Sequence, residues 1–335
     1  MKSGISIKEI SKQAGVSIAT VSRVINKKGR YSKETEERVM RLIEENHYEP
    51  NLVARGLRVQ KTKNVGIIVP DITNEFFMKL VSKVEKYLFA EGYETFLCNT
   101  DEDEQLECKR TQMMTMQNVC GLIFMSGGAS NLAVSDMDLP MVFIDRFPKN
   151  PQEHCCMISS DNVHGGYLAT KELLEQGCKK ILAITSRENI SVYAERFEGY
   201  TRALNEQGME PVHVAYLDRL HYQDAYEKMN RILDFGGFPY DGIFAEADWL
   251  ALGCYRALQE HGYQVPEQVK IAGFDDISIT AFNAVPITTV RQQVDVIGKL
   301  AAEHLLKILK EEEIPEKVIR VPVQLVPRES TRGKQ

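Results

Sequence analysis

The apolar residues near the N-terminus recur with the spacing of a helix. In the segment 17–26 (SIATVSRVIN), the residues that share one side of a helix are Val21, Val24 and Ile25. The segment 6–13 is also helix-sized, and Gly15 supplies a turn between the two. A buried strand is the alternative, since Ile, Thr and Val favour strands, but the apolar positions do not alternate. The spacing predicts a helix-turn-helix unit, whose second helix enters the major groove of DNA.

A third helix is predicted over residues 32–45, where apolar residues recur behind a serine cap. Pro50 ends this head. The next segment, 51–58 (NLVARGLR), is long enough for two helical turns, but so short a helix is unstable alone, and Gly56 weakens it further. We therefore expect disorder there until another molecule binds. A plain flexible linker over 51–63 is the alternative.

From residue 64 onward, short apolar runs alternate with helix-sized segments. The runs predicted as buried strands are 65–69, 95–98, 122–125, 141–144, 157–160, 181–185, 212–216, 242–245 and 269–274. The helical segments lie near 75–91, 103–118, 129–136, 162–176, 194–207, 222–235 and 249–261. A helix near 294–312 and a strand-like run over 318–326 follow. Buried strands joined by helices predict doubly wound parallel sheets. Two such series predict an α/β core of two lobes, with a ligand crevice at the carboxyl ends of the strands.

The distribution of charge supports DNA binding by the head alone. The whole chain carries a net charge of −6. Residues 1–63, however, contain fourteen Lys and Arg against seven Glu and no Asp, about +7, and the remainder is about −13. A basic head on an acidic body binds phosphates with the head only. Chance clustering of charge on a solvated helical segment is the alternative.

The cysteines and the apolar runs bear on location. Seven cysteines show no CxxC pair and no metal-ligand spacing, so we expect reduced thiols, no metal and no cofactor. The first residues contain no apolar signal core, and no apolar run approaches the length of a membrane span. The expected location is the cytoplasm, without a membrane partner.

No motif for catalysis is present. The sequence lacks the phosphate-binding, zinc-protease and serine-hydrolase patterns, and the glycine pairs at 127–128 and 165–166 fit strand-to-helix turns. The chain is therefore not expected to be an enzyme. Charged and aromatic residues instead follow the predicted strands, as a polar-ligand site requires. The candidates of this kind are Phe76, Phe77, Asp145, Arg196, Asp248 and Asp275.

Five motifs now occur together in one order: GVSIATVSRVIN, YSKETEERV, NHYEPNLVARGLR, KNVGIIVPD and GFDD. Along essentially its whole length the chain resembles the lac repressor family of bacterial regulators. The resemblance implies a head over residues 1–50 and a hinge over 51–63. It also implies a discontinuous N-terminal lobe (64–161 plus 290–321) and C-terminal lobe (162–289 plus 322–330) resembling periplasmic binding proteins.

The resemblance assigns two sets of contacts to operator DNA. In the hinge it implies that Leu57 wedges into the minor groove, with Ala54 and Arg55 beside it. On the second helix we expect Arg23 to contact a guanine edge, Ile18 and Ala19 thymine methyl groups, and Thr20 and Ser22 the phosphates. Ser17 and Asn26 are the other residues of this segment that are expected to contact DNA.

The resemblance further implies a small effector, such as a sugar or sugar derivative, between the lobes of a dimeric repressor, with a tetramer left open. It strengthens Arg196 and Asp275 as effector ligands and adds Gln292. One departure is Ala247, where the family usually carries asparagine, and the loop 217–222 matches the family poorly. Both departures leave the identity of the effector open.

Three rival functions remain. A catabolite-control regulator would bind a phosphorylated carrier protein, but its Tyr-Asp pair is Asp295-Val296 here and its docking arginine is Glu303. A purine-responsive repressor would bind a nucleobase. A solute-binding transport component would need export, which the basic head and the missing signal core oppose.

Overall fold

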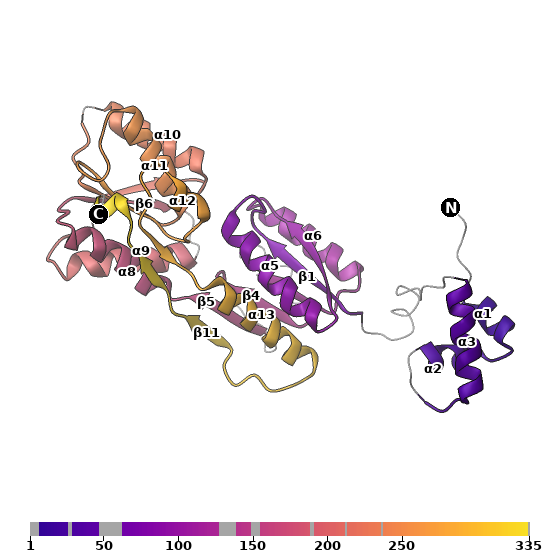
Figure 1. The fold of residues 1–335 in the computed structure, drawn as a ribbon. Helices are drawn as coiled ribbons and strands as arrows, with labels where there is room; N and C mark the ends of the chain where they lie inside the picture. Colours follow the sequence, from indigo (N-terminus) through magenta and orange to yellow (C-terminus); the bar gives the residue numbers. More distant parts are fainter. Residues whose placement is uncertain are drawn as a thin grey trace. The chain divides into compact units, whose positions relative to one another are not determined.

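The computed structural model describes residues 7–25, 29–46, 62–126, 139–148, 155–187, 191–211, 213–235 and 237–333. It divides the chain into two compact units, with the boundary between Thr62 and Lys63. We call residues 63–335 the core, and the helices of the first unit make up the head (Figure 1).

The head consists of three helices: α1 (Ile7–Ala14), α2 (Ile18–Ile25) and α3 (Lys33–Glu45). Gly15 has φ +65, which only a residue without a side chain adopts freely, and it separates α1 from α2 as the sequence predicts. Oγ of Ser17 accepts a hydrogen bond from the backbone N–H of Thr20 at 3.1 Å and so stabilises the start of α2. The small apolar core comprises Ile10, Ala14, Val21, Val24 and Val39. The predicted helix-turn-helix unit is confirmed.

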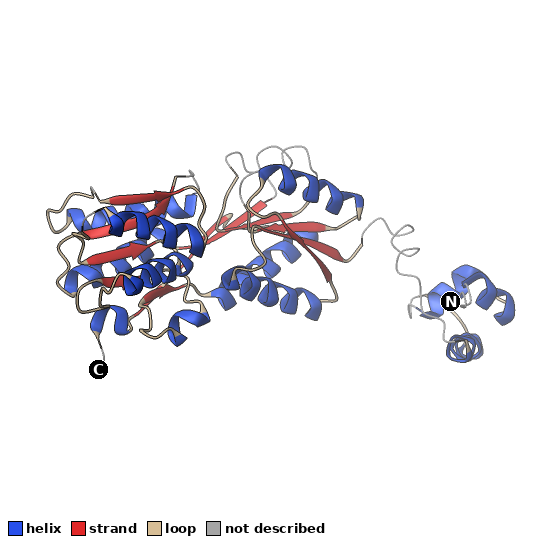
Figure 2. Cartoon of the chain, turned by 90° about the horizontal axis from the view of Figure 1, so that it is seen from above, coloured by secondary structure: helices blue, strands red, loops and turns tan. Residues whose placement is uncertain are grey.

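The first lobe of the core is built on a parallel six-stranded sheet in the order β11-β5-β4-β3-β1-β2. The strands are β1 (Asn64–Val69), β2 (Glu94–Asn99), β3 (Gly121–Phe124), β4 (Met141–Ile144), β5 (Cys155–Ser160) and β11 (Val318–Val321). Successive side chains point to opposite faces of a strand. Ile67 accordingly packs in the cluster of α5 (Glu75–Ala90) and α13 (Val294–Leu309), and Ile68 packs with Met114 of α6 (Glu104–Met116). Helices therefore cover both faces (Figure 2).

The second lobe holds a parallel four-stranded sheet in the order β7-β6-β8-β9. Its strands are β6 (Ile181–Ser186), β7 (Val214–Leu217), β8 (Gly242–Ala245) and β9 (Lys270–Ala272). The helices are α8 (Asn162–Glu175), α9 (Ser191–Asn205), α10 (Tyr222–Asp234) and α11 (Asp248–Glu260). Leu173 and Tyr200 of α8 and α9 pack in one cluster, and Met229 and Leu250 of α10 and α11 pack in another, so this sheet is also covered on both faces.

The predicted strand over 318–326 is wrong as a single element. β11 ends at Val321 and belongs to the first sheet, whereas β12 (Gln324–Val326) pairs antiparallel with β10 (Thr289–Arg291). Pro322 lies between them, and a proline has no backbone N–H to continue a ladder. Two short helices, α12 (Ser278–Phe282) and α14 (Glu329–Arg332), were not predicted.

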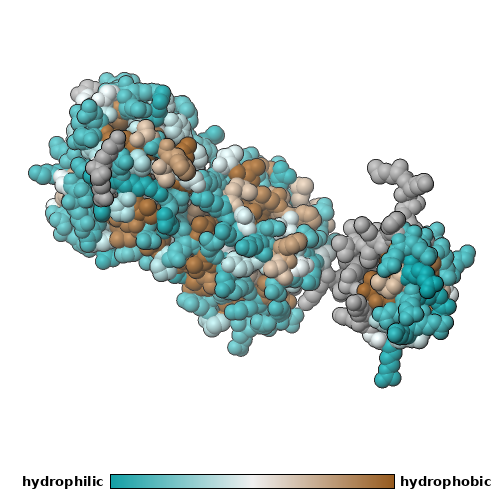
Figure 3. Space-filling view, in the orientation of Figure 1, coloured by the Kyte–Doolittle hydropathy of each residue, from teal (hydrophilic) through white to brown (hydrophobic). Residues whose placement is uncertain are grey.

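Some predictions fall outside the described residues, namely Asn26, Ala54, Arg55, Leu57 and the helix expected over 129–136. Within the described part of the chain, no helix is long and apolar enough to cross a membrane. Hydrophilic residues cover most of the face drawn in Figure 3, and apolar residues appear there in small patches between them.

Candidate functional site

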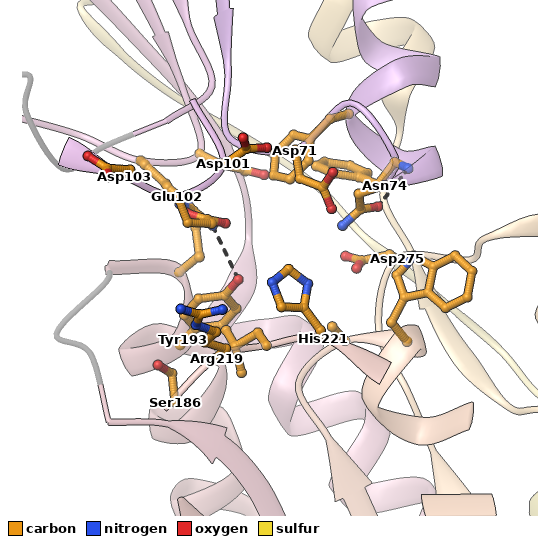
Figure 4. A pocket seen from close by; sticks show the side chains of 18 of the residues that line it. Asp71, Asn74, Asp101, Glu102, Asp103, Ser186, Tyr193, Arg219, His221 and Asp275 are labelled. Atoms are coloured by element: carbon orange, nitrogen blue, oxygen red, sulfur yellow. Dashed lines mark hydrogen bonds and ion pairs between the residues drawn. The ribbon is translucent and has the colours of Figure 1, made fainter. Parts of the chain in front are cut away.

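The core contains a cavity of about 560 Å³ between its two lobes. Side chains that follow strands of both sheets line it, including Asp71 after β1, Asp145 after β4, Asp218 after β7 and Asp275 after β9. In Figure 4, Asp71 and Asn74 lie on one side, Ser186, Tyr193 and Arg219 on the other, and His221 and Asp275 between them. A cavity of this size at the carboxyl ends of parallel strands is suited to a small ligand.

The wall of the cavity is acidic and partly aromatic. Its carboxylates are Asp71, Asp101, Glu102, Asp103, Asp145, Asp218 and Asp275. The basic and imidazole side chains are Arg146, Arg196, Arg219 and His221. The aromatic rings are Phe76, Phe77, Tyr193 and Trp249. Carboxylates can accept hydrogen bonds from ligand hydroxyls, guanidinium groups can donate to ligand oxygens, and rings can cover an apolar ligand face.

Several of these acidic residues have a left-handed backbone. The φ angles are +50 for Asp101, +58 for Glu102, +64 for Asp145 and +113 for Asp275. Residues other than glycine rarely adopt such angles, and those that do cluster at functional sites. The turns after the strands are therefore strained in the conformation that directs their carboxylates at the cavity.

Arg196 is the most firmly held group in the cavity. Its Nε donates to Oδ1 of Asn162 at 3.0 Å, and its Nη1 donates to the carbonyl of Glu246 at 2.6 Å. Its guanidinium lies 3.5 Å from Oδ1 of Asp275 and 3.7 Å from the ring centre of Phe274. The side chain is 4% exposed, so its direction is fixed before a ligand arrives.

Two glycines allow Arg196 to reach this position. A Cβ at Gly166 would lie 2.0 Å from the carbonyl oxygen of Arg196, and a Cβ at Gly199 would lie 2.1 Å from that of Val163. Helices α8 and α9 therefore approach so closely that only glycine fits at these two crossing points. The close packing places Arg196 against Phe274 and the floor of the cavity.

A chain of hydrogen bonds orients Asp275. Oγ of Ser160 donates to Oε1 of Gln292 at 2.6 Å, and Nε2 of Gln292 donates to Oδ1 of Asp275 at 2.7 Å. Burial raises the pKa of Asp275 to about 6, although Arg196 and Gln292 act in the opposite direction. Burial likewise raises the pKa of Asp145 against the effect of Arg196. The guanidinium of Arg196 is thus the nearby positive charge that both carboxylates share. Hydrogen-bond donors from a ligand would further stabilise the ionised forms of Asp145 and Asp275.

Arg146 connects three elements around the cavity. It forms a two-pronged ion pair with Glu102, in which Nη2 lies 2.9 Å from Oε1 and Nη1 contacts Oε2. Nη2 also donates to the hydroxyl of Tyr193 at 3.3 Å. Burial raises the pKa of Tyr193 to about 12, so this hydroxyl is neutral and can accept the bond. Arg146 and Glu102 belong to the first lobe and Tyr193 to the second, so the cluster spans the cavity.

Glu246 is a fully buried acid beneath the cavity. Its Oε2 accepts a hydrogen bond from Oγ1 of Thr185, and its Oε1 has no partner among the described residues. Burial raises the pKa of Glu246 to about 8 in spite of the Thr185 bond and Arg196. The carboxyl group is therefore protonated at neutral pH and adds no charge to the floor of the cavity.

On α2 of the head, the predicted DNA-contacting side chains lie away from the helix core. Val21 and Val24 are buried, whereas Ser17, Ala19 and Arg23 are exposed. Ile18, Thr20 and Ser22 are partly exposed. The helix therefore has one face for packing and one face free to contact another molecule.

Comparisons with known proteins agree with both units. The family model "Bacterial regulatory proteins, lacI family" matches residues 6–51, and the model "Periplasmic binding protein-like domain" matches residues 170–331. A ribose operon repressor of Halalkalibacterium halodurans is 35% identical, with 98% of this chain and 97% of the relative covered. The transcriptional repressor PurR of Haemophilus influenzae is also 35% identical, with 98% of both covered. The chain belongs to the lacI family of bacterial regulatory proteins.

The same fold occurs in a crystal structure of the lac repressor dimer bound to operator and the anti-inducer ONPF. The TM-score is 0.87, the identity 22%, and 98% of this chain and 99% of that chain are covered. Like other members of the lacI family, the protein is a DNA-binding transcriptional regulator and not an enzyme.

Five of the seven effector ligands predicted from the sequence line the cavity, and two do not. Phe76, Phe77, Asp145, Arg196 and Asp275 line it. Gln292 is 1% exposed and lies behind Asp275, which it orients. The prediction for Asp248 needs correction, because its Oδ1 accepts from Thr289 at 2.6 Å and its Oδ2 from the backbone N–H of Ile277 at 2.9 Å. Asp248 is fully buried and fastens the segment that carries Asp275.

Four cavity residues were not predicted from the sequence: Glu102, Tyr193, Arg219 and His221. Glu102 follows β2, so the rule that ligands bind at strand ends could have found it. Tyr193 precedes Arg196 by three residues on α9 and therefore shares its helix face. Arg219 and His221 lie in the segment 217–222, where the match to the family motifs is poor and gave no signal.

Proposed function

We propose that this regulator is a repressor whose effector is a neutral or weakly charged sugar, or a sugar derivative, bound between the lobes. The observation that carries the proposal is the convergence of Asp145, Asp275 and Arg196 in one cavity beside two phenylalanine rings. Two carboxylates offer acceptors for several hydroxyls. Nη2 of the Arg196 guanidinium, whose Nε and Nη1 are bonded to Asn162 and Glu246, can donate to ligand oxygens. The name of the ribose operon repressor supports a sugar as the effector class.

In this proposal the aromatic residues contact one part of the ligand and the polar residues contact another. Phe76 and Phe77 cover its apolar face, and their rings meet edge to face at 5.3 Å. Asp145 and Asp275 accept from hydroxyls. Arg196 donates to ring or hydroxyl oxygens, with Gln292 and Asp248 supporting Asp275 from behind.

The lobes are joined by bonds that depend on the angle between them. The Glu75 carboxylate, at the start of α5, accepts from the backbone N–H of Ser278 at 2.9 and 3.0 Å. A second link is made by Arg320 of β11, which donates to Glu195 of α9 at 2.7 and 2.9 Å. An effector that prefers one lobe angle shifts the population toward it, and by linkage the DNA-bound state must prefer one angle too.

For the DNA side we propose a homodimer on a two-fold symmetric operator in the cytoplasm. Arg23, Ile18 and Ala19 contact base edges, and Ser17, Thr20, Ser22 and Asn26 contact or position the backbone. Ala54, Arg55 and Leu57 of the hinge, which lie outside the described residues, enter the minor groove. We further propose that the lobes comprise residues 64–161 plus 290–321 and 162–289 plus 322–330.

A purine is the second candidate effector, because the relative named PurR matches as closely as the ribose operon repressor. A purine ring would stack on Phe76 or Phe77. Two buried carboxylates, however, suit a molecule rich in donors better than a flat base with few. A phosphorylated carrier protein is opposed by the surface of α13, where Asp295 pairs with Lys83 and Glu303 with Lys299.

The test is a calorimetric titration of the full chain with neutral pentoses and hexoses, purine bases and a phosphorylated carrier protein. The proposal expects a sugar to bind the parent and to bind Asp275→Asn more weakly. Operator binding is measured with and without each ligand. If only the carrier protein binds, and it binds Asp275→Asn as tightly as the parent, the result contradicts the proposal and supports the catabolite-control hypothesis. Binding of a purine alone selects the second candidate.

A further inference from the structure

We infer that Glu102 sets the charge preference of the cavity by neutralising Arg146, so that effectors bearing a phosphate or carboxylate group are rejected. This inference rests on the proposed sugar-type effector and adds a residue that determines its charge class. Glu102 does not act through catalysis or through a metal. It acts by occupying the guanidinium that an anionic ligand would otherwise bind.

Arg146 has the properties of an anion site. Its side chain is 6% exposed, it lines the cavity, and Nη2 points to Tyr193 across the crevice. A guanidinium presents a planar fork of donors that matches a carboxylate or a phosphate. Arg196, the other buried guanidinium of the wall, is already bonded to Asn162, to the Glu246 carbonyl and to Asp275. Arg219 is exposed at the rim.

Glu102 occupies both prongs of this fork. Its two carboxylate oxygens contact Nη1 and Nη2 of Arg146, the arrangement that an incoming carboxylate ligand would need. Its side chain is 35% exposed, so it reaches Arg146 from the rim and is not buried beneath it. An anionic ligand would have to displace Glu102 or lie beside it, and either arrangement is unfavourable.

The backbone shows how the chain places Glu102. Asp101 and Glu102 are consecutive left-handed residues, with φ +50 and +58. The turn is held by its main chain, because the N–H of Glu102 donates to Pro70 at 3.1 Å and the N–H of Asp103 to Thr100 at 2.9 Å. The side chain of Glu102 is not needed for these bonds. Glu102→Gln therefore retains the turn and the shape of the side chain, and removes only its charge.

The charge balance of the buried wall follows from this pair. With Arg146 neutralised by Glu102, the remaining buried charges are Asp145 and Asp275 against Arg196, an excess of one negative charge. A hydroxyl donor is attracted to this wall and an anion is repelled. Without the charge of Glu102 the four buried charges of the wall balance, and Arg146 is free to bind an oxyanion.

The experiment compares matched neutral and anionic probes in the full chain. The pairs are D-ribose with D-ribose 5-phosphate and D-glucose with D-glucuronate, titrated by calorimetry. We expect the parent to prefer the neutral member, and Glu102→Gln to shift the ratio of affinities toward the anionic member by about tenfold. Inorganic phosphate serves as a probe that needs no sugar: it should raise the melting temperature of Glu102→Gln more than that of the parent, relative to chloride at equal ionic strength.

Two controls separate charge selection from general effects. Glu206→Gln removes one negative charge from the surface just after α9, where Glu206 pairs with Arg202 of that helix, and should leave the ratio within about twofold of the parent. In the double variant Glu102→Gln/Arg146→Gln the gain for anions should disappear, because the freed guanidinium is absent. The double variant also distinguishes a freed Arg146 from a loosened turn.

The outcomes separate this inference from the proposed function. If neutral sugars bind the parent and Glu102→Gln leaves both the ratio and the phosphate response unchanged, the inference is overturned and the sugar effector stands. If purines alone bind the parent while Glu102→Gln gains phosphate binding through Arg146, the sugar effector fails and the charge role of Glu102 stands. If anionic probes bind the parent as tightly as their neutral partners, Glu102 does not select charge.

Discussion

On helix α2 of the head, Arg23 is exposed and its guanidinium has no partner among the described residues. In the cavity, Arg196 is buried and bonded to Asn162, the Glu246 carbonyl and Asp275. The same side chain is thus presented in opposite ways at the two surfaces that contact other molecules. An arginine that contacts DNA can remain solvated until it binds a base edge. An arginine that binds a ligand in a closed cavity must be oriented before the ligand arrives.

The difference predicts how each region responds to substitution. Removing a solvated side chain from α2 should change binding and leave the stability of the fold unchanged. Removing a member of the cavity network should change both, because partners are left buried without a bond. Substitutions in both regions test this contrast.

The largest effect is expected at Gly166. A Cβ there meets the Arg196 carbonyl oxygen at 2.0 Å, so Gly166→Ala should push α9 away from α8 and displace Arg196. The expected loss is about 3 kcal/mol of unfolding free energy, together with the effector response. Denaturant unfolding and calorimetry measure the two quantities.

Gly208→Ala is the matched control for that substitution. Gly208 has φ +68 and no atom within 4 Å of its missing Cβ, so alanine brings backbone strain of about 1 kcal/mol without moving Arg196. Effector binding should survive in this variant. Equal effects of the two substitutions would mean that the close approach of α8 and α9 does not position Arg196.

Asp275→Asn should change stability and binding in opposite directions. The pKa of Asp275 is raised to about 6, so the folded protein keeps a proton that the unfolded chain loses above pH 4. Stability therefore falls as the pH rises from about 4 to 6, and asparagine should restore about 1–3 kcal/mol at pH 7. Effector binding should weaken by about 1–3 kcal/mol, since a hydroxyl loses its charged acceptor. Operator affinity without effector should be nearly unchanged.

The pH dependence of binding checks the same assignment. Ligand hydroxyls stabilise ionised Asp275, so the parent should bind its effector more tightly as the pH rises through about 6. Burial also raises the pKa of Asp145, which lies in the same environment, so Asp145 contributes to the slope as well. Asp275→Asn should flatten the profile, as measured by calorimetry between pH 5 and 7.5. A profile that is equally steep in the variant would assign the titration to Asp145.

The contrast between the regions also explains what the sequence could predict. In the head, the spacing of Val21 and Val24 fixes which face of α2 is buried, so the outward residues follow from the helix period alone. In the core, strand and helix order predicted the doubly wound lobes, and the strand-end rule predicted Asp145 and Asp275 as cavity residues. Rules based on local sequence failed where tertiary contacts determine whether a side chain faces the cavity.

Asp248 shows this failure most clearly. It stands at the start of α11 after a strand, the same local setting as a ligand residue, yet Thr289 and Ile277 occupy both of its oxygens. These partners lie about thirty to forty residues away in sequence, so no local pattern reveals them. Glu102 differs from Asp248, because it lines the cavity but was not predicted to do so. Its role depends on Arg146, which belongs to another turn and lies beside it only in the folded protein.

A smaller effect, confined to one position of the operator, is expected for Arg23→Ala. The loss should be about 1–3 kcal/mol at one base pair per half-site, with the melting temperature of the protein unchanged. Binding to operators substituted at each position in turn measures it. A uniform loss over all sequences would make Arg23 a phosphate contact.

The smallest effects are expected for a serine-to-alanine substitution, made once in the head and once in the core. Ser17→Ala removes an exposed cap whose Oγ accepts from the Thr20 N–H at 3.1 Å, which should cost about 1 kcal/mol of head stability and weaken operator binding. Ser160→Ala removes the buried hydroxyl that donates to Gln292 at 2.6 Å, two bonds away from the ligand. Because Gln292 then holds Asp275 less firmly, effector affinity should fall by about 1 kcal/mol while operator binding without effector is retained. Each variant is the control for the other. If Ser160→Ala weakens operator binding as much as Ser17→Ala does, the chain from Ser160 to Asp275 supports the core as a whole and not the ligand site.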